Sequence, residues 1–523
     1  MNSSLYRDPS NNGRSNNNSH SDNGRTTSKN RASNASANKD KDKQSGKAKV
    51  RTSTSRTGSR IRTRQVKRVS PARALALKVT SDVRKRGAHT HEVLEKELKT
   101  AKLSKEDKAF ATVLSFGVAM CLGSLDIIIN KSLNFTRDID ENVRDALRIS
   151  TYELYYLGKQ DHAAVDQGVE LVRSIAPRAD KLANAVLRKL VANKAQFPFG
   201  NPETDTTARA LLYGFPEWLT LRLEQDLGSH AAQELMKASN EQAPLFVSIN
   251  AACATQDAVL SIFDSEGVIY HPQHFENAEV PSCYLLENSS DIQKPEIAKL
   301  LDRCCILVSD LSAQIIALLA LPEKYPSSFL EIGAGRGTKT LLLQSGAIQK
   351  YGKQMHYVTL DNHAFKSRVL ESRAKRAGIR VAHACTYDAT KISPSYFVKE
   401  KCGVKDGLFD AVFVDAPCSG LGTLRRHPEI RWRITQDAIN DLACLGMSIL
   451  SAASTCVNAG GMLVYSTCTV TKAENEEVIM RFLNSAQGKN FQIIPIANHA
   501  SFSSSVRSGS SDAHFCVCLK RKD

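Results

Sequence analysis

The sequence predicts a doubly wound α/β domain with a seven-stranded, mainly parallel sheet, preceded by an all-helical domain and a small α+β connector. Three observations lead to this fold class. Strand-like and helical stretches alternate after about residue 301, apolar residues recur at helical spacing between residues 71 and 200, and the segment between mixes both patterns. With 523 residues, the chain is long enough for several domains, each with its own core.

Residues 1–70 form a basic tail of distinct composition. They carry ten Arg and seven Lys against four Asp, a net charge of +13, so the rest of the chain carries only +3 of the total of +16. Almost nothing apolar precedes Ile61, and a segment that cannot bury apolar surface is expected to stay disordered. The charge favours attraction to a polyanion such as RNA, and a merely solvated extension is the alternative.

The two middle domains follow from periodicity and its interruptions. Stretches such as "VRDALRISTYELYYL" and "ADKLANAVLRKLVAN" place apolar residues at i, i+3, i+4 and i+7, which predicts a helical bundle. "FPFGNPETD" (197–205) breaks the pattern, so we expect the bundle domain to cover residues 71–205. Residues 206–300 contain two helical segments and the strand-like runs "LFVSIN" and "SCYLLE", which predict the α+β connector.

The α/β domain is expected over residues 301–523. Its expected strands cover residues 328–333, 355–361, 379–385, 408–415, 461–467, 491–495 and 514–520. Helical stretches separate most of these strands, which predicts a mainly parallel sheet. In such a sheet, ligands bind at the carboxyl ends of the strands.

Hydropathy and cysteine usage restrict the compartment. No run of eighteen uncharged apolar residues occurs, and the first residues lack the apolar core of a secretory signal, so we expect a cytoplasmic protein without a membrane span. The thirteen cysteines form no CxxC pair and lie mostly in apolar surroundings such as "CCILV". This pattern favours reduced thiols over disulfides or a zinc site, and we expect no metal.

The ends of the first three strands carry features of an adenosine-containing ligand site. The first strand runs into "EIGAGRGTKT", where Gly333, Gly335 and Gly337 permit a tight turn and close approach of a ligand to the backbone. Asp361 ends the second strand and is placed to accept hydrogen bonds from ribose hydroxyls. Because the GxGxxG pattern is missing, S-adenosylmethionine is favoured over a dinucleotide. Asp388, after the third strand, is a candidate for an adenine amino group or simply a solvated loop acid.

The fourth and fifth strands deliver "DAPC" and "YSTC", which would bring Asp415, Cys418 and Cys468 to the same cleft. Carbon 5 of a pyrimidine is a poor nucleophile until a thiolate adds to carbon 6. An acid hydrogen-bonded at N3 assists that addition, and a base must later remove the carbon 5 proton. Two cysteines and an aspartate beside a methyl donor supply groups for these steps.

These motifs resemble those of the RsmB-type (Sun/Fmu) RNA cytosine-5 methyltransferases, most clearly in "DAPCSGLGTLRRHPEIRW" and "YSTCTVTKAENEEVI". The resemblance covers residues 71–523. The segments "LRISTYELYYL", "DHAAVDQGVEL" and "NAVLRKL" are similar to the NusB-like RNA-binding domain fused to RsmB. The resemblance therefore implies a Rossmann-like S-adenosylmethionine-dependent methyltransferase domain that acts on small-subunit (16S) ribosomal RNA.

The same resemblance implies roles for individual residues. Cys468 would be the nucleophile, and Cys418 would help to release the methylated product. Asp415 would hold the cytosine near the methyl donor, and Lys339 matches the motif lysine beside that donor. The two acids at the second and third strand ends match the ribose- and adenine-contacting acids of the family.

The basic stretch after the "PC" motif is the candidate RNA contact. Arg425, Arg426 and Arg431 are expected to hold phosphates beside a flipped cytosine, with a solvated basic loop as the alternative. His427 and Trp432 are expected to be packing residues rather than platforms for stacked bases.

The chain also departs from the family pattern. "GAGRGTKT" stands where the family usually has a sequence close to CAAPGGKT, so Arg336 replaces a proline and Thr338 a glycine. Two alternative functions remain open on the sequence: methylation of transfer RNA, and a NusB-like RNA-binding factor with a degenerate methyltransferase domain. We expect the protein to be a monomer.

Overall fold

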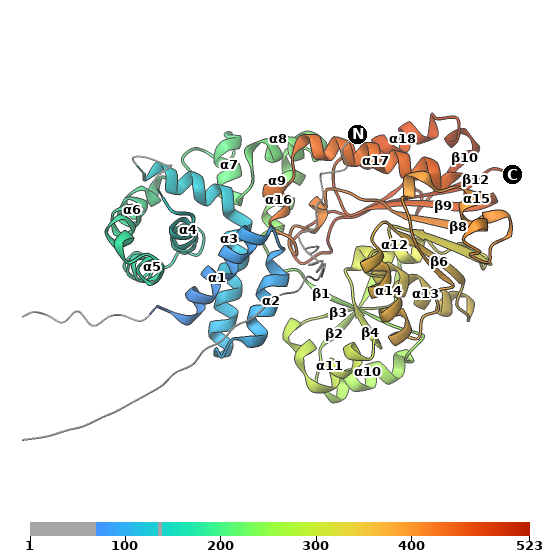
Figure 1. Ribbon diagram of the computed structural model, residues 1–523, viewed down its shortest axis with the longest axis horizontal. Coiled ribbons are helices and arrows are strands. Elements are labelled where there is room, and N and C mark those ends of the chain that lie inside the picture. Colours follow the sequence, from blue (N-terminus) through green and yellow to red (C-terminus); the bar gives the residue numbers. More distant parts are fainter. Residues whose placement is uncertain (1–68, 134–138) are drawn as a thin grey trace, which may run out of the picture. The chain divides into compact units, whose positions relative to one another are not determined.

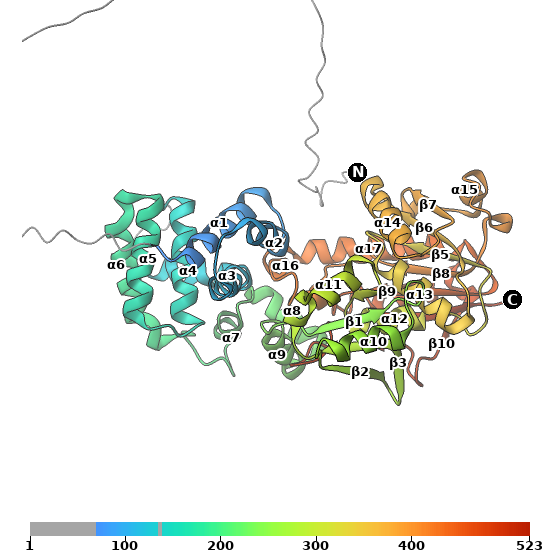
Figure 2. The same ribbon diagram turned by 90° about the horizontal axis from the view of Figure 1, so that it is seen from below.

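The protein is described here by a computed structural model that covers residues 69–133 and 139–523. The expected basic tail, apart from residues 69 and 70, lies outside the described residues. The first helices form a bundle (Figures 1 and 2). They are α1 (Pro71–Arg86), α2 (Thr90–Thr100), α3 (Lys105–Lys131), α4 (Glu141–Tyr155), α5 (Asp161–Ile175) and α6 (Asp180–Asn193).

Helix α2 is the bundle helix that periodicity does not reveal. Its sequence, "THEVLEKELKT", is largely charged, and its buried apolar side chains are Val93 and Leu94. These two pack with Val79 of α1 in a small apolar cluster. So short an apolar stripe gives no clear helical signal in the sequence.

Helix α3 is the central helix of the bundle. Among the described residues it is the one helix long and apolar enough to cross a membrane by length and composition, but 56% of its most apolar window is buried inside the protein. Leu114, Leu125 and Ile128 are fully buried against the neighbouring helices. The burial of these α3 side chains is that of a core helix.

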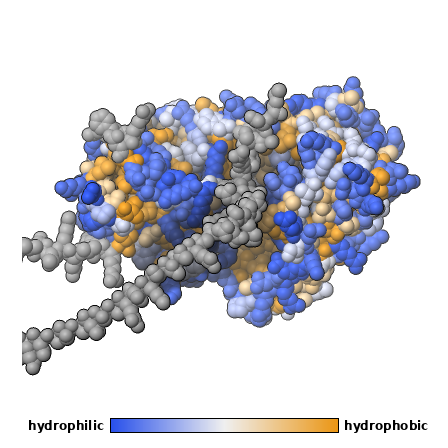
Figure 3. Space-filling view, viewed as in Figure 1, coloured by the Kyte–Doolittle hydropathy of each residue, from blue (hydrophilic) through white to orange (hydrophobic). Residues whose placement is uncertain are grey.

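On the face of the molecule drawn in Figure 3, orange apolar side chains are interspersed with blue hydrophilic ones.

Three helices and a small sheet lead from the bundle to the α/β domain. The helices are α7 (Thr206–Tyr213), α8 (Glu217–Leu227) and α9 (Ser229–Ala238). The antiparallel sheet has the order β2-β3-β1-β4 and is made of β1 (Leu245–Ile249), β2 (Tyr270–Phe275), β3 (Ala278–Leu286) and β4 (Ile306–Val308). Helices α10 (Gln256–Ser265) and α11 (Pro295–Asp302) belong to this α+β unit, which extends past the expected boundary at residue 300.

The large sheet confirms the predicted fold class. Its order is β10-β12-β9-β8-β5-β6-β7, with β11 paired to β12. The strands are β5 (Ser328–Ile332), β6 (His356–Asp361), β7 (His383–Thr386), β8 (Phe409–Asp415), β9 (Val457–Thr467), β10 (Phe491–Ile494), β11 (Phe502–Ser503) and β12 (Phe515–Arg521). The run β7-β6-β5-β8-β9 is parallel, and β12 is antiparallel to its neighbours.

Helices cover both faces of this sheet (Figure 1). The helices of this domain are α12 (Leu311–Leu319), α13 (Thr338–Tyr351), α14 (Ala364–Arg376), α15 (Pro394–Lys399), α17 (Gln436–Ser454) and α18 (Glu476–Leu483), while the short α16 (Ile430–Arg433) lies next to α3 of the bundle. Side chains alternate between two cores, because successive strand residues point to opposite faces. Leu330 of β5 packs in one core with Leu450 of α17, whereas Phe329 packs in the other with Leu343 of α13.

Candidate active site

The register of the parallel strands brings the expected site residues to one edge of the sheet. Ile332 of β5 pairs with Leu360 of β6 on one side and with Val414 of β8 on the other. Asp415 pairs with Ser466 of β9. The loops that follow these strands therefore start side by side, as the ends of neighbouring parallel strands must.

The glycine-rich turn after β5 needs glycine for steric reasons. Gly333 has φ +82°, and a Cβ placed on it would lie 2.2 Å from the backbone oxygen of Asp415. Gly335 and Gly337 also have positive φ values, of +56° and +84°, which β-carbons disfavour. Helix α13 begins directly after Gly337, at Thr338, so its free N–H groups face the same edge. The backbone form of the turn thus tolerates the unusual Arg336.

Asp361 is held in place by the neighbouring backbone. One carboxylate oxygen accepts a hydrogen bond from the N–H of Gly335 at 2.9 Å, and the other accepts one from the N–H of His363 at 2.9 Å. Each oxygen keeps a further lone pair, so the acid is oriented without being saturated. The turn and the acid at the second strand end are therefore one hydrogen-bonded unit.

Asp388 is tied to its own loop. It caps the short turn that follows β7 by accepting hydrogen bonds from the backbone N–H and hydroxyl of Thr390, and it pairs with Lys391 at 3.0 Å. Hydrogen bonds from these two residues lower the pKa of Asp388. Its side chain is 45% exposed, so the loop-acid alternative describes these contacts as well as a ligand role does.

Lys339 and Asp415 form an ion pair at the centre of the edge. Lys339 Nζ lies 2.7 Å from Asp415 Oδ2. Burial alone would lower the pKa of Lys339, but the charge of Asp415 and its hydrogen bond outweigh burial, and the pKa is raised. The lysine is therefore a fixed cation beside the cysteines.

Cys418 and Cys468 face each other across the two loops. Their sulfur atoms lie 3.2 Å apart, and the backbone N–H of Cys468 points at Cys418 Sγ at 3.3 Å. The hydrogen bond from Cys418 lowers the pKa of the Cys468 thiol, and Lys339 lowers it further. The same hydrogen bond and burial raise the pKa of Cys418 well above its usual range. The pair therefore favours a thiolate on Cys468 with its proton partner on Cys418.

Glu474 is a positioning residue that no sequence motif singles out. Its carboxylate accepts hydrogen bonds from the N–H and hydroxyl of Ser419, at 2.6 and 2.7 Å, and from the hydroxyl of Thr471 at 2.6 Å. It thus joins the residue after Cys418 to the loop after Cys468. The motif "KAENEEV" predicts the start of a helix, but α18 begins only at Glu476. Glu474 therefore lies before the helix, where its side chain is buried.

The expectation that Arg425 and Arg431 contact RNA is wrong for this structure. Arg431 is fully buried, donates to Asn240 Oδ1 at 2.8 Å and lies 4.0 Å from the ring centre of Phe215. Arg425 is 7% exposed and donates to the backbone oxygens of Ala238 and Ser510. Both guanidinium groups are enclosed by the protein and donate to protein acceptors through their NH groups, although Arg431 Nε has no partner, so neither group is presented to a phosphate at the surface.

The positive charge of Arg426 is also neutralised within the protein. It lies 2.8 Å from Asp512 and 3.4 Å from Asp310, so two carboxylates balance its charge. Trp432 is a packing residue, as expected: its indole N–H donates to the backbone oxygen of Met120 in α3 at 2.8 Å. Trp432 thus fastens the stretch after the "PC" motif to the helical bundle.

The chain matches known families over each of its described regions. Residues 317–513 match the family described as "16S rRNA methyltransferase RsmB/F", residues 70–192 match the "NusB family", and residues 215–293 match a "Methyltr_RsmF/B-like, ferredoxin-like domain". In solved structures, "Crystal Structure of PH0851" has the same fold, with a TM-score of 0.69 at 20% identity, covering 87% of this chain and 99% of that chain.

Curated relatives match most of the chain. The "Probable ribosomal RNA small subunit methyltransferase B" of Synechocystis sp. is 30% identical over 423 residues, which cover 79% of this chain and 89% of that protein. The protein of the same name from Bacillus subtilis is 28% identical over 416 residues, covering 79% and 88%. These matches include the bundle, the connector and the α/β domain, and the chain belongs to the ribosomal RNA small subunit methyltransferase B family.

Proposed function

We propose that this protein is an S-adenosylmethionine-dependent RNA cytosine-5 methyltransferase that acts on small-subunit (16S) ribosomal RNA. The observation that carries the proposal is the pair of facing thiols, Cys418 and Cys468, beside the ion pair of Lys339 and Asp415. Family membership supports a methyltransferase. The names of the relatives support the ribosomal substrate.

The chemistry follows from the residues at the strand ends. The Cys468 thiolate forms a bond to carbon 6 of the cytosine, and the electrons of the 5,6 double bond make carbon 5 nucleophilic. Asp415 is assigned to hold the ring through a hydrogen bond at its N3 edge, with the Lys339 cation beside it as negative charge develops in the ring. After carbon 5 has taken the methyl group, a base removes its proton, the bond between sulfur and carbon 6 breaks, and the double bond is restored. Cys418 lies within reach of the same sulfur and is assigned to this release step.

Nearby residues fit S-adenosylmethionine, which supplies an electrophilic methyl group when bound. The turn from Gly333 to Gly337 lets the ligand approach the backbone, since a side chain at Gly333 would strike Asp415. Asp361 keeps lone pairs for two ribose hydroxyls, and Asp388 is proposed to contact the adenine. Arg336 projects from the turn and lies 3.7 Å from Glu92 of α2, so the residue that departs from the family pattern has a partner within the chain.

The test is methyl transfer from labelled S-adenosylmethionine to purified 16S ribosomal RNA, with bisulfite sequencing to map the modified base. We expect 5-methylcytosine at a defined position with the wild type and at least about 10³-fold less with Cys468→Ala, because the covalent route is lost. Methyl transfer to transfer RNA but not to ribosomal RNA would contradict the proposed ribosomal substrate. Failure to bind S-adenosylmethionine would instead favour an RNA-binding factor with a degenerate catalytic domain.

A further inference from the structure

A cluster of histidines and one glutamate lies outside the cysteine site, where the start of α2 meets the stretch after the "PC" motif. His89 Nδ1 lies 2.6 Å from Glu429 Oε1, and the ring centres of His89 and His427 are 5.5 Å apart. The ring of His91 lies 5.0 Å from that of His427. These side chains come from positions more than 300 residues apart in the chain, so no sequence spacing could have revealed the cluster.

The imidazoles have nitrogen atoms without partners in a buried setting. Nδ1 of His427 and Nδ1 of His91 are both buried and accept or donate no hydrogen bond. A buried polar atom without a partner costs about 1–3 kcal/mol, so such atoms usually have a ligand.

The distances suit one small metal ion. One ligand atom each from His89, His427 and Glu429 can be chosen so that all lie within 4.8 Å of one another. Two imidazoles on one tetrahedral zinc ion, with zinc–nitrogen bonds of about 2 Å, would have ring centres about 5 Å apart. The carboxylate of Glu429 is 5% exposed and lies 2.6 Å from His89 Nδ1. A charged oxygen ligand is thus already desolvated at the site.

We propose that His89, His427 and Glu429 bind a divalent transition-metal ion of the zinc class. Two imidazoles and one carboxylate favour zinc over magnesium or calcium, which prefer oxygen ligands alone. The fourth ligand of a tetrahedral ion would be a water molecule. Ligation displaces the hydrogen bond between His89 and Glu429 and releases the proton that they share. The expectation of no metal relied on cysteine spacing, which has no bearing on a site made of histidines.

The ion would fasten the bundle to the catalytic loop. His89 is the residue before α2, and Glu92 in the first turn of α2 pairs with Arg336 of the glycine-rich turn. His427 and Glu429 follow Cys418 in the same loop. Arg433 is the opposing positive charge, but its guanidinium donates to the backbone oxygens of Gly87 and Ala88 and is thereby held in place.

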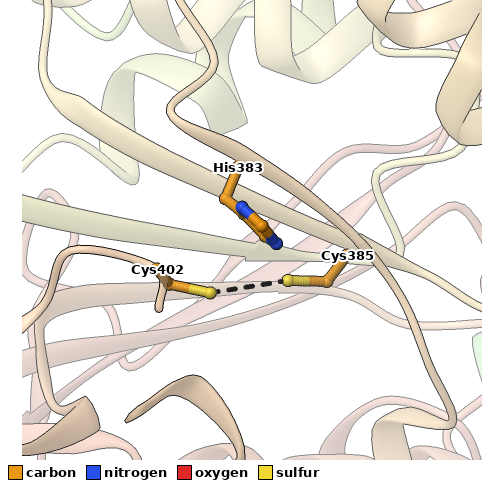
Figure 4. A group of neighbouring side chains, drawn as sticks. All are labelled: His383, Cys385 and Cys402. Atoms are coloured by element: carbon orange, nitrogen blue, oxygen red, sulfur yellow. Dashed lines mark hydrogen bonds between the residues drawn. The ribbon is translucent and has the colours of Figure 1, made fainter. Parts of the chain in front are cut away.

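A second cluster in the described residues provides the contrast. His383, Cys385 and Cys402 also lie within metal-binding distance of one another (Figure 4). There the two sulfurs are 3.7 Å apart and hydrogen-bond to each other, and burial raises the pKa of Cys385 to about 12. The two thiols are hydrogen-bonded to each other, and His383 has no buried nitrogen without a partner, unlike His427 and His91.

The experiment is a titration of the chelator-stripped full-length protein with Co²⁺, followed by displacement with Zn²⁺. We expect the visible absorption of four-coordinate Co²⁺ to saturate at one ion per chain, without a thiolate charge-transfer band. His89→Ala and His427→Ala should each weaken Zn²⁺ binding by about 100-fold or more. Cys402→Ser and His383→Ala are the matched controls and should leave binding unchanged.

Three results would overturn the proposal. They are no saturable binding by the wild type, binding retained by His89→Ala, and a thiolate band that disappears with Cys402→Ser. The His89 side chain is 46% exposed, so His89→Ala is expected to fold even if His427→Ala does not. The readout is metal binding alone, and it is independent of whether the protein transfers methyl groups.

Discussion

The two thiols at the strand ends are not equivalent, although both are cysteines in the same cleft. Cys468 receives the hydrogen bond from Cys418 and is influenced by the Lys339 cation, and both effects lower its pKa. Cys418 carries the proton of the pair, and its pKa is raised. A thiolate is the nucleophilic form of cysteine, so the local electrostatics favour attack by Cys468.

Replacement of Lys339 by methionine should raise the pKa of the Cys468 thiol, because the stabilising cation is lost while Asp415 stays. A thiol with a higher pKa reacts only at higher pH, so the pH profile for alkylation of Cys468 should move upward. Peptide mass spectrometry measures that profile. Lys391→Met removes a lysine that pairs with Asp388 instead and should leave it unchanged. If the pH profile of alkylation for Lys339→Met were unchanged or moved to lower pH, Lys339 would not be the cation that lowers the pKa of Cys468.

At the scale of elements, the strands were predictable and the arginine-rich stretch was not. Strand Phe409–Asp415 contains an uninterrupted apolar run at residues 411–414 that ends in a polar residue, and parallel strands buried on both faces have this pattern. The sequence around Arg431, in contrast, predicts an exposed, charged side chain, because a sequence does not show which backbone oxygens will surround it. The contacts of Arg431 with Asn240 and Phe215 join segments about two hundred residues apart in the chain.

Replacement of Arg431 by alanine should lower the free energy of unfolding by about 2–4 kcal/mol, since it leaves buried oxygen acceptors without donors. Urea denaturation measures this change. Arg433→Ala is the matched control, because the Arg433 hydrogen bonds are exposed, and it should cost no more than about 1 kcal/mol. If Arg431→Ala kept full stability but weakened RNA binding, the original expectation of an RNA contact would be right after all.

At the scale of the whole molecule, one short stretch joins the helical bundle to the α/β domain. The indole of Trp432 in α16 donates to Met120 of α3, and a Cβ on Gly123 would lie 2.3 Å from the Trp432 ring. Glu429 contacts His89 at the start of α2. The sequence predicted both domains and the packing role of Trp432. Its partners in the bundle were not predictable, because they depend on how two separately folded surfaces meet.

Replacement of Gly123 by alanine should lower the free energy of unfolding by about 1–3 kcal/mol, because the new methyl group overlaps the Trp432 ring. In a Trp432→Ala background the same change should cost nothing and could add up to about 1 kcal/mol from helix propensity. A double-mutant cycle by urea denaturation separates the two effects. Equal effects of Gly123→Ala in both backgrounds would show that the ring and the helix are not in contact.

The central claim is that Cys468 attacks the cytosine and Cys418 releases the product. The most direct measurement is denaturing gel electrophoresis of the protein after incubation with S-adenosylmethionine and 16S ribosomal RNA. Cys418→Ala should accumulate a covalent protein–RNA species, because the adduct forms but does not break down, and the double variant with Cys468→Ala should form none. A covalent species that persists without Cys468, or one that requires Cys418, would contradict the assignment of the two thiols.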